Sequence, residues 1–170
     1  MILSAIAMPT LIRAYRSYVL NDATSRFAGI VKLTRFEAIR RNTQVPLRVQ
    51  QNGTTWIAWA DRNNNNVADP VEPQVLLVGM VGVIPAPASP STSPIAAAIG
   101  STPTVLSAST SSVAYDARGA VNFGGGPPAV YVFYLGNPAI PDFGARAVVL
   151  LPSGIVQVWS SASGTWRQQS

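Results

Sequence analysis

The sequence predicts an α+β fold in which one long N-terminal helix packs on antiparallel β-sheet. Apolar residues recur at helical spacing over roughly the first forty residues, and short β-like runs separated by Gly, Pro and Asn turns fill the rest. One helix followed by a series of strands, without alternation of the two, is typical of the α+β class. The chain of 170 residues is also long enough for one domain with a hydrophobic core.

The N-terminal helix is predicted over residues 1–41. Residues 1–12 are uncharged and mostly apolar, and an amphipathic stripe continues beyond them, with most of the basic residues off the stripe. This is the pattern of a helix that lies on a sheet. Pro9 lacks a backbone donor and crowds the preceding turn, so a kink or break is expected there. Asn42, Thr43 and Pro46 are predicted to end the helix. The stripe consists of Val19, Ala23, Phe27, Ile30, Val31, Thr34 and Ala38.

A β-rich domain is predicted over residues 42–170. Asn52 and Gly53 stand between the runs 45–50 and 54–60, and an Asn-Gly pair is a strong hairpin signal. Residues 85–112 are rich in Pro, Ala, Ser and Thr, which cannot support a packed core. We therefore expect a long, exposed and flexible loop there, with one short strand around Val105. The other expected strands are 75–84, 113–116, 121–123, 129–135, 145–151 and 155–159.

The composition excludes several enzyme classes. The chain has no Cys and no His, so it lacks disulfides, thiolate metal ligands and the usual general base near neutral pH. Ser is plentiful, but no suitable Lys lies near to activate a nucleophile. We expect no enzymatic activity and no catalytic residues.

The aromatic residues are candidates for a sugar-stacking face. Strand alternation places Trp56 and Trp59 on opposite sides of their strand, however, so no continuous platform results. Core packing is the favoured interpretation of these aromatics, which also include Tyr131, Phe133, Tyr134, Trp159 and Trp166.

The positive charge is concentrated in the predicted helix. Residues 1–50 hold eight basic and two acidic residues, a net charge of +6, whereas residues 51–170 hold four basic and five acidic ones, a net charge of −1. A basic helix attracts anionic lipid headgroups or nucleic acid. A solvated helix face beside a membrane anchor is the favoured interpretation.

Residues 61–72 have the spacing of an EF-hand calcium loop. Oxygen side chains occupy loop positions 1, 3, 5, 9 and 12, and position 7 supplies a backbone carbonyl. Asn66 replaces the usual Gly at position 6, and Asn tolerates the left-handed conformation. Because strands flank the segment, an Asx-rich turn without metal is the alternative; a rise of the unfolding midpoint in millimolar calcium would distinguish the two. The predicted ligands are Asp61, Asn63, Asn65, the Val67 carbonyl, Asp69 and Glu72.

The first residues resemble the N-terminal helix of type IV pilins. In that family a very apolar segment passes a proline and becomes amphipathic, as residues 2–8, Pro9 and residues 10–18 do here. The resemblance implies a helix that anchors the subunit in a membrane and later packs in the core of a filament. The assembly contacts are expected from Ile2, Leu3, Ile6, Met8, Pro9, Leu11 and Ile12.

The family's cleavage site and early Glu are not present in this sequence. We therefore expect that the chain lacks its first stretch, because a bilayer span needs about 20 apolar residues, more than residues 1–12 supply. An ordinary buried helix start or a weak signal peptide is the alternative. A signal peptide carries its positive charge before the apolar run, whereas Arg13 and Arg16 follow it.

Four internal stretches resemble the GspH/FimT branch of pilin-like proteins, in an order that covers nearly the whole chain. They are 36–42, with Glu37 at a helix end; 56–63, a Trp-containing strand that leads into an Asp-x-Asn turn; 113–119; and 145–154. The resemblance implies a pilin-like minor pseudopilin or minor pilin that helps to initiate or cap a type II secretion pseudopilus or type IV pilus. It further implies a methylated N-terminus, a single-pass inner-membrane location with a periplasmic domain, and other pilin-like subunits as partners.

Two alternative functions remain open. DNA-binding members of the branch have a basic Gly-Arg-x-Arg-like segment near the C-terminus, whereas Gly154 is followed here by Ile155, Val156 and Gln157. A DNA-binding minor pilin for DNA uptake is therefore the runner-up, with Arg167 as the DNA contact. A secreted carbohydrate-binding β domain is the alternative from another class.

Overall fold

The computed structural model describes residues 3–78, 80–140, 143–162 and 164–169, and the side chains of the N-terminal helix from Thr10 onward. This helix, α1 (Leu3–Arg41), is continuous, so Pro9 does not break it. It ends where expected: Asn42 has a φ of 49°, and the Thr43 amide donates a hydrogen bond of 3.2 Å to the Ala38 carbonyl. A left-handed residue after the last turn is a common helix end, and Asn tolerates that conformation.

The predicted stripe of α1 is the face that packs on the sheets. Phe27, Val31 and Ala38 are fully buried. The buried hydroxyls of Thr24 and Thr34 donate hydrogen bonds to the carbonyls four residues earlier, at 2.6 and 2.8 Å. Because these polar groups are satisfied within the helix, the face can be buried without an unpaired donor.

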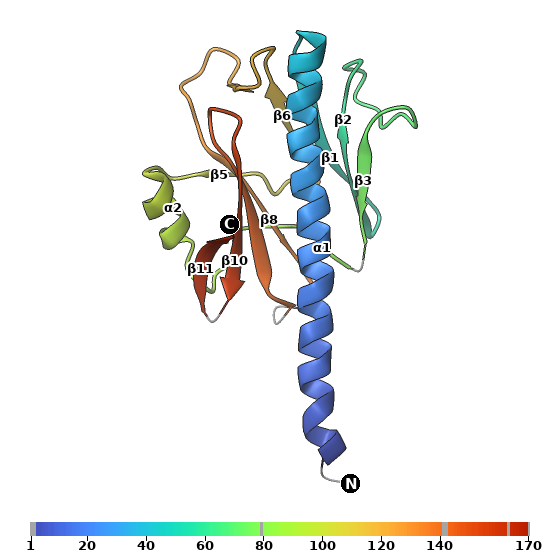
Figure 1. The fold of residues 1–170 in the computed structure, drawn as a ribbon, viewed down its shortest axis with the longest axis vertical. Helices are drawn as coiled ribbons and strands as arrows, with labels where there is room; N and C mark the ends of the chain where they lie inside the picture. The colour runs from blue at the N-terminus through green and yellow to red at the C-terminus, as the bar shows by residue number, and fades with distance from the viewer. Residues whose placement is uncertain (1–2, 79, 141–142, 163, 170) are drawn as a thin grey trace.

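The strands form two sheets, and in Figure 1 β2 and β3 lie to the right of α1 while β8, β10 and β11 lie to its left. The first sheet has the order β3 (Gln74–Leu77), β2 (Thr55–Ala60), β1 (Val45–Asn52), β6 (Thr110–Tyr115) and β7 (Val121–Asn122). The second has the order β11 (Thr165–Gln169), β10 (Val156–Ala162), β9 (Ala145–Leu150), β8 (Tyr131–Gly136) and β4 (Gly82–Ile84), and β5 (Thr104–Val105) also pairs with β8. The described pairings are antiparallel except that of β5 with β8. The predicted α+β class is confirmed.

The main core lies between α1 and both sheets. The ring of Phe27 on α1 meets that of Phe133 on β8 edge to face, with centroids 5.1 Å apart. A second, smaller core lies on the outer side of the second sheet, where Ile95 packs with Trp159 and Trp166. Both faces of the second sheet are therefore buried.

The structure corrects one expectation about strands and adjusts another. The run 75–84 is not one strand, because β3 belongs to the first sheet and β4 to the second. The chain changes sheet around Met80, whose φ is 62°. A Cβ at Gly82 would lie 2.3 Å from Nε1 of Trp56, so a larger residue does not fit at the start of β4. The hairpin at Asn52 and Gly53 is confirmed with its turn displaced by one residue, since Asn52 pairs with Thr55.

The segment 85–112 contains structure that the sequence reading did not predict. A short helix, α2 (Ser93–Ile99), begins with a proline in its first turn and ends at Gly100, and it fully buries Ile95. The expectation that this segment contributes nothing to a packed core is therefore wrong, whereas the short strand around Val105 is confirmed as β5. The final strand β11, in which Trp166 is buried between exposed neighbours, was also not predicted from the sequence.

Candidate assembly surface

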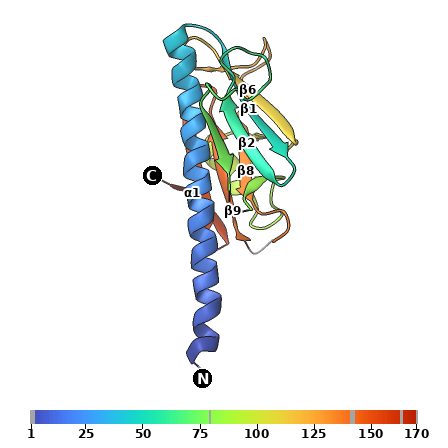
Figure 2. The same ribbon diagram turned by 90° about the vertical axis from the view of Figure 1, so that its right-hand side faces the viewer.

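The N-terminal part of α1 extends beyond the two sheets (Figures 1 and 2). From Thr10 to Val19 every side chain is exposed or half-buried, and Leu20 is the first buried one along the described side chains. The helix attaches to the body at this level: Arg146 on β9 donates hydrogen bonds to Oδ1 of Asn21 at 2.9 Å and to Oγ of Ser17 at 3.4 Å. Burial lowers the pKa of the Arg146 guanidinium.

The extension exposes large apolar and aromatic side chains. Leu11, Tyr15 and Tyr18 are 70%, 66% and 70% exposed, and Ile12 is 49% exposed. Leu11, Tyr15 and Tyr18 follow the spacing i, i+4, i+7, so they lie on one face of the helix. Fully burying one such side chain stabilises an assembly by about 1.5–3 kcal/mol. The two tyrosines were not among the predicted assembly residues, although their spacing from Leu11 was a readable signal.

A groove of about 470 Å³ lies beside this extension, where α1 passes the edge of the body. From the connections that follow β3 and β8, the groove is lined by Met80, Ile140 and Phe143. From the helix it is lined by Leu11, Ile12, Tyr15, Arg16 and Val19. These body residues are far from the helix in sequence, so sequence reasoning could not bring them together.

The predicted assembly residues fall into three groups. Ile2 lies outside the described residues. Helix α1 includes Leu3, Ile6, Met8 and Pro9, of which the structure describes the backbone and not the side chains. Leu11 and Ile12 are exposed, as an assembly contact requires. Within the described residues, no helix combines the length and the hydropathy that a membrane span needs.

The opposite end of α1 is tied to the loop 61–72 through Glu37. This buried carboxylate contacts the guanidinium groups of Arg40 at 2.7 Å, Arg41 at 3.3 Å and Arg62 at 3.0 Å. The hydrogen bond from Arg40 and the charge of Arg62 lower the pKa of Glu37 against the opposing effect of burial. The helix end and the first residues of the loop are therefore held together by one acidic side chain.

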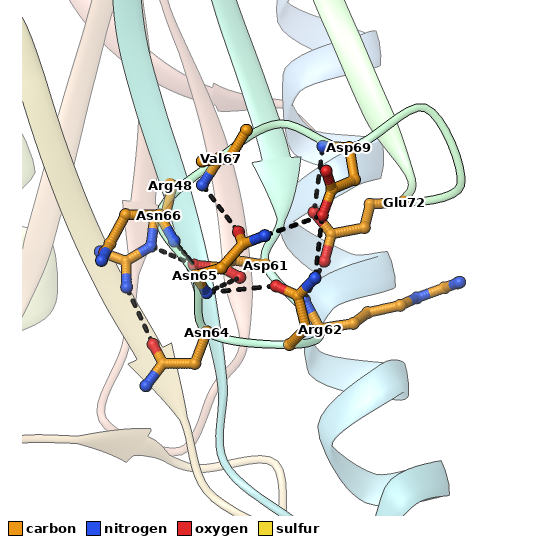
Figure 3. A network of polar contacts seen from close by, with 10 residues as sticks. Arg48, Asp61, Arg62, Asn64, Asn65, Asn66, Val67, Asp69 and Glu72 are labelled. Atoms are coloured by element: carbon orange, nitrogen blue, oxygen red, sulfur yellow. Dashed lines mark hydrogen bonds and ion pairs between the residues drawn. The ribbon is translucent and has the colours of Figure 1, made fainter.

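The loop 61–72 is held by its own side chains (Figure 3). Asp61 is fully buried, pairs with Arg48 and accepts hydrogen bonds from the amides of Asn65 and Asn66, both at 3.1 Å. Asn66 has a φ of 65°, which confirms that it adopts the left-handed conformation expected at loop position 6. Glu72 accepts a hydrogen bond of 2.6 Å from the Arg62 amide.

The donor set of this loop does not fit a calcium ion in the described conformation. The side-chain amides of Asn63 and Asn65 point their NH₂ groups at Oδ2 of Asp69, at 2.8 and 3.0 Å, while the oxygen of Asn65 accepts from the Val67 amide. A search of the described residues finds no group of three or more Asp or Glu arranged to hold a metal. Calcium coordination would require both amides to turn so that their oxygens replace the NH₂ groups. The hydrogen bonds favour the alternative, an Asx-rich turn, and calcium binding stays a prediction.

The residues of the two alternative functions differ in their placement. Arg167 is exposed on β11, at the edge of the second sheet, and DNA binding there stays a prediction. The four Trp residues of the chain, 56, 59, 159 and 166, are at most 6% exposed. The interpretation of these residues as core is confirmed, and no sugar-stacking platform is formed by them.

Comparisons with known proteins agree with this arrangement. A family model described as "Type II transport protein GspH" matches residues 23–154, which is more than half of the chain. The search of curated proteins finds no match. The structure is similar to the crystal structure of the type IV minor pilin FimU from Pseudomonas aeruginosa PAO1, with a TM-score of 0.54 at 13% sequence identity, over 86% of this chain and 92% of that one. At this identity the similarity shows the fold, which is pilin-like.

Proposed function

Because the chain belongs to the GspH family of type II transport proteins, we propose that it joins a filament through the extension of α1 and helps to initiate or cap that filament. The family and the pilin-like fold support the role of a minor pseudopilin or minor pilin, which is structural. The filament is either a type II secretion pseudopilus or a type IV pilus. In this role the chain supports protein secretion by assembly and not by catalysis.

The observation that carries this proposal is the exposed face of the extension. In an isolated subunit the side chains of Leu11, Tyr15 and Tyr18 remain in water, because each is 66–70% exposed. Burying them would lower the free energy of an assembly. A neighbouring pilin-like helix packed along this face would remove them from water. The β-rich body would then remain at the filament surface or tip, because burial of α1 against the body begins at Leu20 along the described side chains.

The proposed location before assembly is the bacterial inner membrane. The uncharged residues 1–12 would form the last part of a membrane anchor, and the body would lie on the periplasmic side. Mass mapping of the native protein tests this stage: an N-methylated mature end supports it, and an unmodified N-terminus at Met1 contradicts it.

Site-specific photocrosslinking tests the assembly contact. We place p-benzoylphenylalanine at position 15 or 18 in cells that produce the complete set of pilin-like subunits. We expect ultraviolet-dependent adducts with another pilin-like subunit at both positions. The control replaces Val71, which is 82% exposed and lies on the loop at the other end of the body.

Equal adducts at positions 15, 18 and 71, or none at 15 and 18, would contradict the contact. The initiating or capping role has its own readout, which is the number of filaments and the position of immunogold label. An initiator or cap gives label at one filament end, and its deletion lowers the number of filaments; label along the whole length would exclude that role.

A further inference from the structure

The edge of the body that faces the N-terminus of α1 is apolar and exposed. Met80 is 69% exposed and Val78 is 52% exposed, both on the connection between β3 and β4. Ile140, on the connection after β8, lines the groove beside α1 together with Met80. We call Val78, Met80 and Ile140 the apolar edge. Exposed apolar residues that gather at one place on a soluble body usually mark a contact surface.

Positive charge lies directly under this edge. Arg13 and Arg16 precede Leu20 by seven and four residues, so they share the helix face that is buried against the body one to two turns later. Arg16 also lines the groove with Met80 and Ile140. The sequence has no acidic residue before Asp22, and Asp22 pairs with Arg26 at 2.9 Å.

The net charge remains positive when the acidic residue in the sequence of these connections is counted. Asp142 is the only acidic residue in the sequence of the connection 137–144, and residues 78–81 contain none. Arg146, which contacts Ser17 and Asn21, adds a third basic group just above Arg13 and Arg16. Three basic residues against one acidic residue give a net charge of +2.

Two tyrosines lie at the same level of the helix, and Tyr15 lines the groove together with Arg16 and Met80. Tyr15 and Tyr18 are exposed at the same height as Arg13 and Arg16. Tyr is enriched where a membrane meets water, because its ring is apolar and its hydroxyl is polar. Along α1 the order is therefore an uncharged segment up to Ile12, a belt of Arg and Tyr over residues 13–18, and then the body.

We propose that the apolar edge rests on an anionic phospholipid surface, with lipid phosphate groups bound by Arg13 and Arg16. Val78, Met80 and Ile140 then enter the headgroup region, and Tyr15 and Tyr18 lie at the same depth. This builds on the proposed membrane stage of the subunit and adds that the body itself docks. A bilayer is favoured over an acidic protein because apolar, cationic and aromatic groups surround the helix at one level, which matches a planar interface.

Vesicle binding of the full chain tests whether the positive charge of Arg13 and Arg16 contributes to the contact with lipid. Flotation with phosphatidylcholine vesicles is compared with flotation on vesicles that also contain phosphatidylglycerol. We expect tighter binding to the anionic vesicles, and Arg13→Gln with Arg16→Gln should weaken it by about fivefold for each arginine, with little change on neutral vesicles. The control is Lys32→Gln with Arg118→Gln, two exposed basic residues near the other end of the body. Lys32 is about 24 Å along the helix from Arg16, well beyond the screening length of about 8 Å.

A fluorophore attached at position 80 tests whether the apolar edge enters the headgroup region. The chain has no Cys, so Met80→Cys carries a single environment-sensitive fluorophore at an exposed site, and Val71→Cys is the control. We expect a blue shift at position 80 and none at 71 when anionic vesicles are added. No shift at position 80 while the chain floats with the vesicles would overturn the proposal, because residues 1–12 alone would then explain binding.

Two further outcomes also decide against it. Equal binding to neutral and anionic vesicles would contradict the proposed recognition of an anionic surface by Arg13 and Arg16. A shift at position 80 that needs another pilin-like subunit, and not vesicles, would assign the edge to a protein partner. Failure of the crosslinks at positions 15 and 18 would contradict the proposed filament contact and leave the vesicle result unaffected, so the two failures are distinguishable.

Discussion

Glu37 is the residue on which the C-terminal end of α1 depends. Glu37 is 7% exposed, and its carboxylate contacts three guanidinium groups, of which Arg62 at 3.0 Å belongs to the loop after β2. Replacing the carboxylate by an amide leaves the partly buried Arg62 without its ion-pair partner. The pair thus couples the helix end to the first sheet.

We expect Glu37→Gln to lower the free energy of unfolding by roughly 1 kcal/mol near neutral pH. The pKa of Glu37 is lowered from 4.5 by its hydrogen bond to Arg40, so the folded state binds the proton less well than the unfolded state. The contribution is therefore present above about pH 4.5 and is lost as the pH falls through the lowered folded value. Chemical denaturation at several pH values measures it.

The matched control for Glu37 is Asp22→Asn. Asp22 pairs with Arg26 at 2.9 Å on the exposed side of the same helix, with side chains 39% and 55% exposed. An exposed pair at i, i+4 contributes less than about 0.5 kcal/mol. A difference between wild type and Glu37→Gln that stays constant down to pH 2 would contradict the role of the Glu37 charge.

At the scale of elements, two hairpin turns and α1 meet at Gly119 and Gly154. Arg35 on α1 donates a hydrogen bond of 2.9 Å to the Gly119 carbonyl. A Cβ at Gly154 would lie only 1.9 Å from that same oxygen, and Gly154 has a φ of 80°. The turn after β9 therefore approaches the turn after β6 so closely that only Gly fits.

We expect Gly154→Ala to destabilise the protein more than Gly53→Ala does. Both residues have positive φ, at 80° and 62°, but a Cβ at Gly53 would meet nothing within 4 Å. The left-handed conformation costs both variants about 1–2 kcal/mol, and the backbone shift adds roughly 1–3 kcal/mol for Gly154→Ala alone. Urea denaturation measures the difference, and equal losses would mean that the two turns do not touch.

At the scale of the molecule, Phe27 joins the helix to the second sheet. It is fully buried and packs edge to face on Phe133 of β8. Its removal creates a cavity between α1 and the sheet, where the surrounding groups cannot fully close. Because α1 packs on both sheets, the defect should affect the stability of the whole protein.

We expect Phe27→Ala to lower the free energy of unfolding by about 3–5 kcal/mol. Phe36→Ala, on the same helix but 62% exposed, should change it by less than about 0.5 kcal/mol. Circular dichroism follows α1, and tryptophan fluorescence follows both sheets, since Trp56 lies on β2 and Trp159 on β10. The two signals should give one transition; separate midpoints would show that helix and sheets unfold independently.

The sequence alone could not place residues whose environment depends on distant parts of the chain. The apolar run 75–84 suits a strand in either sheet, and the structure divides it around Met80, shortly before Gly82 packs against Trp56. Ile95 is buried because the outer face of the second sheet is there to cover it. The groove joins Arg16 to Met80 and Ile140, which have no local pattern in common.

By itself the sequence determined the helix to Arg41, its end at Asn42, the first hairpin and the burial of the Trp residues. These features depend on local periodicity, turn chemistry and side-chain hydrophobicity, which are properties of neighbouring residues. The tertiary structure decided which sheet each strand joins and which side of α1 remains free for Leu11, Tyr15 and Tyr18. Such choices depend on long-range packing, because a helix face or a strand is buried only where another element lies against it.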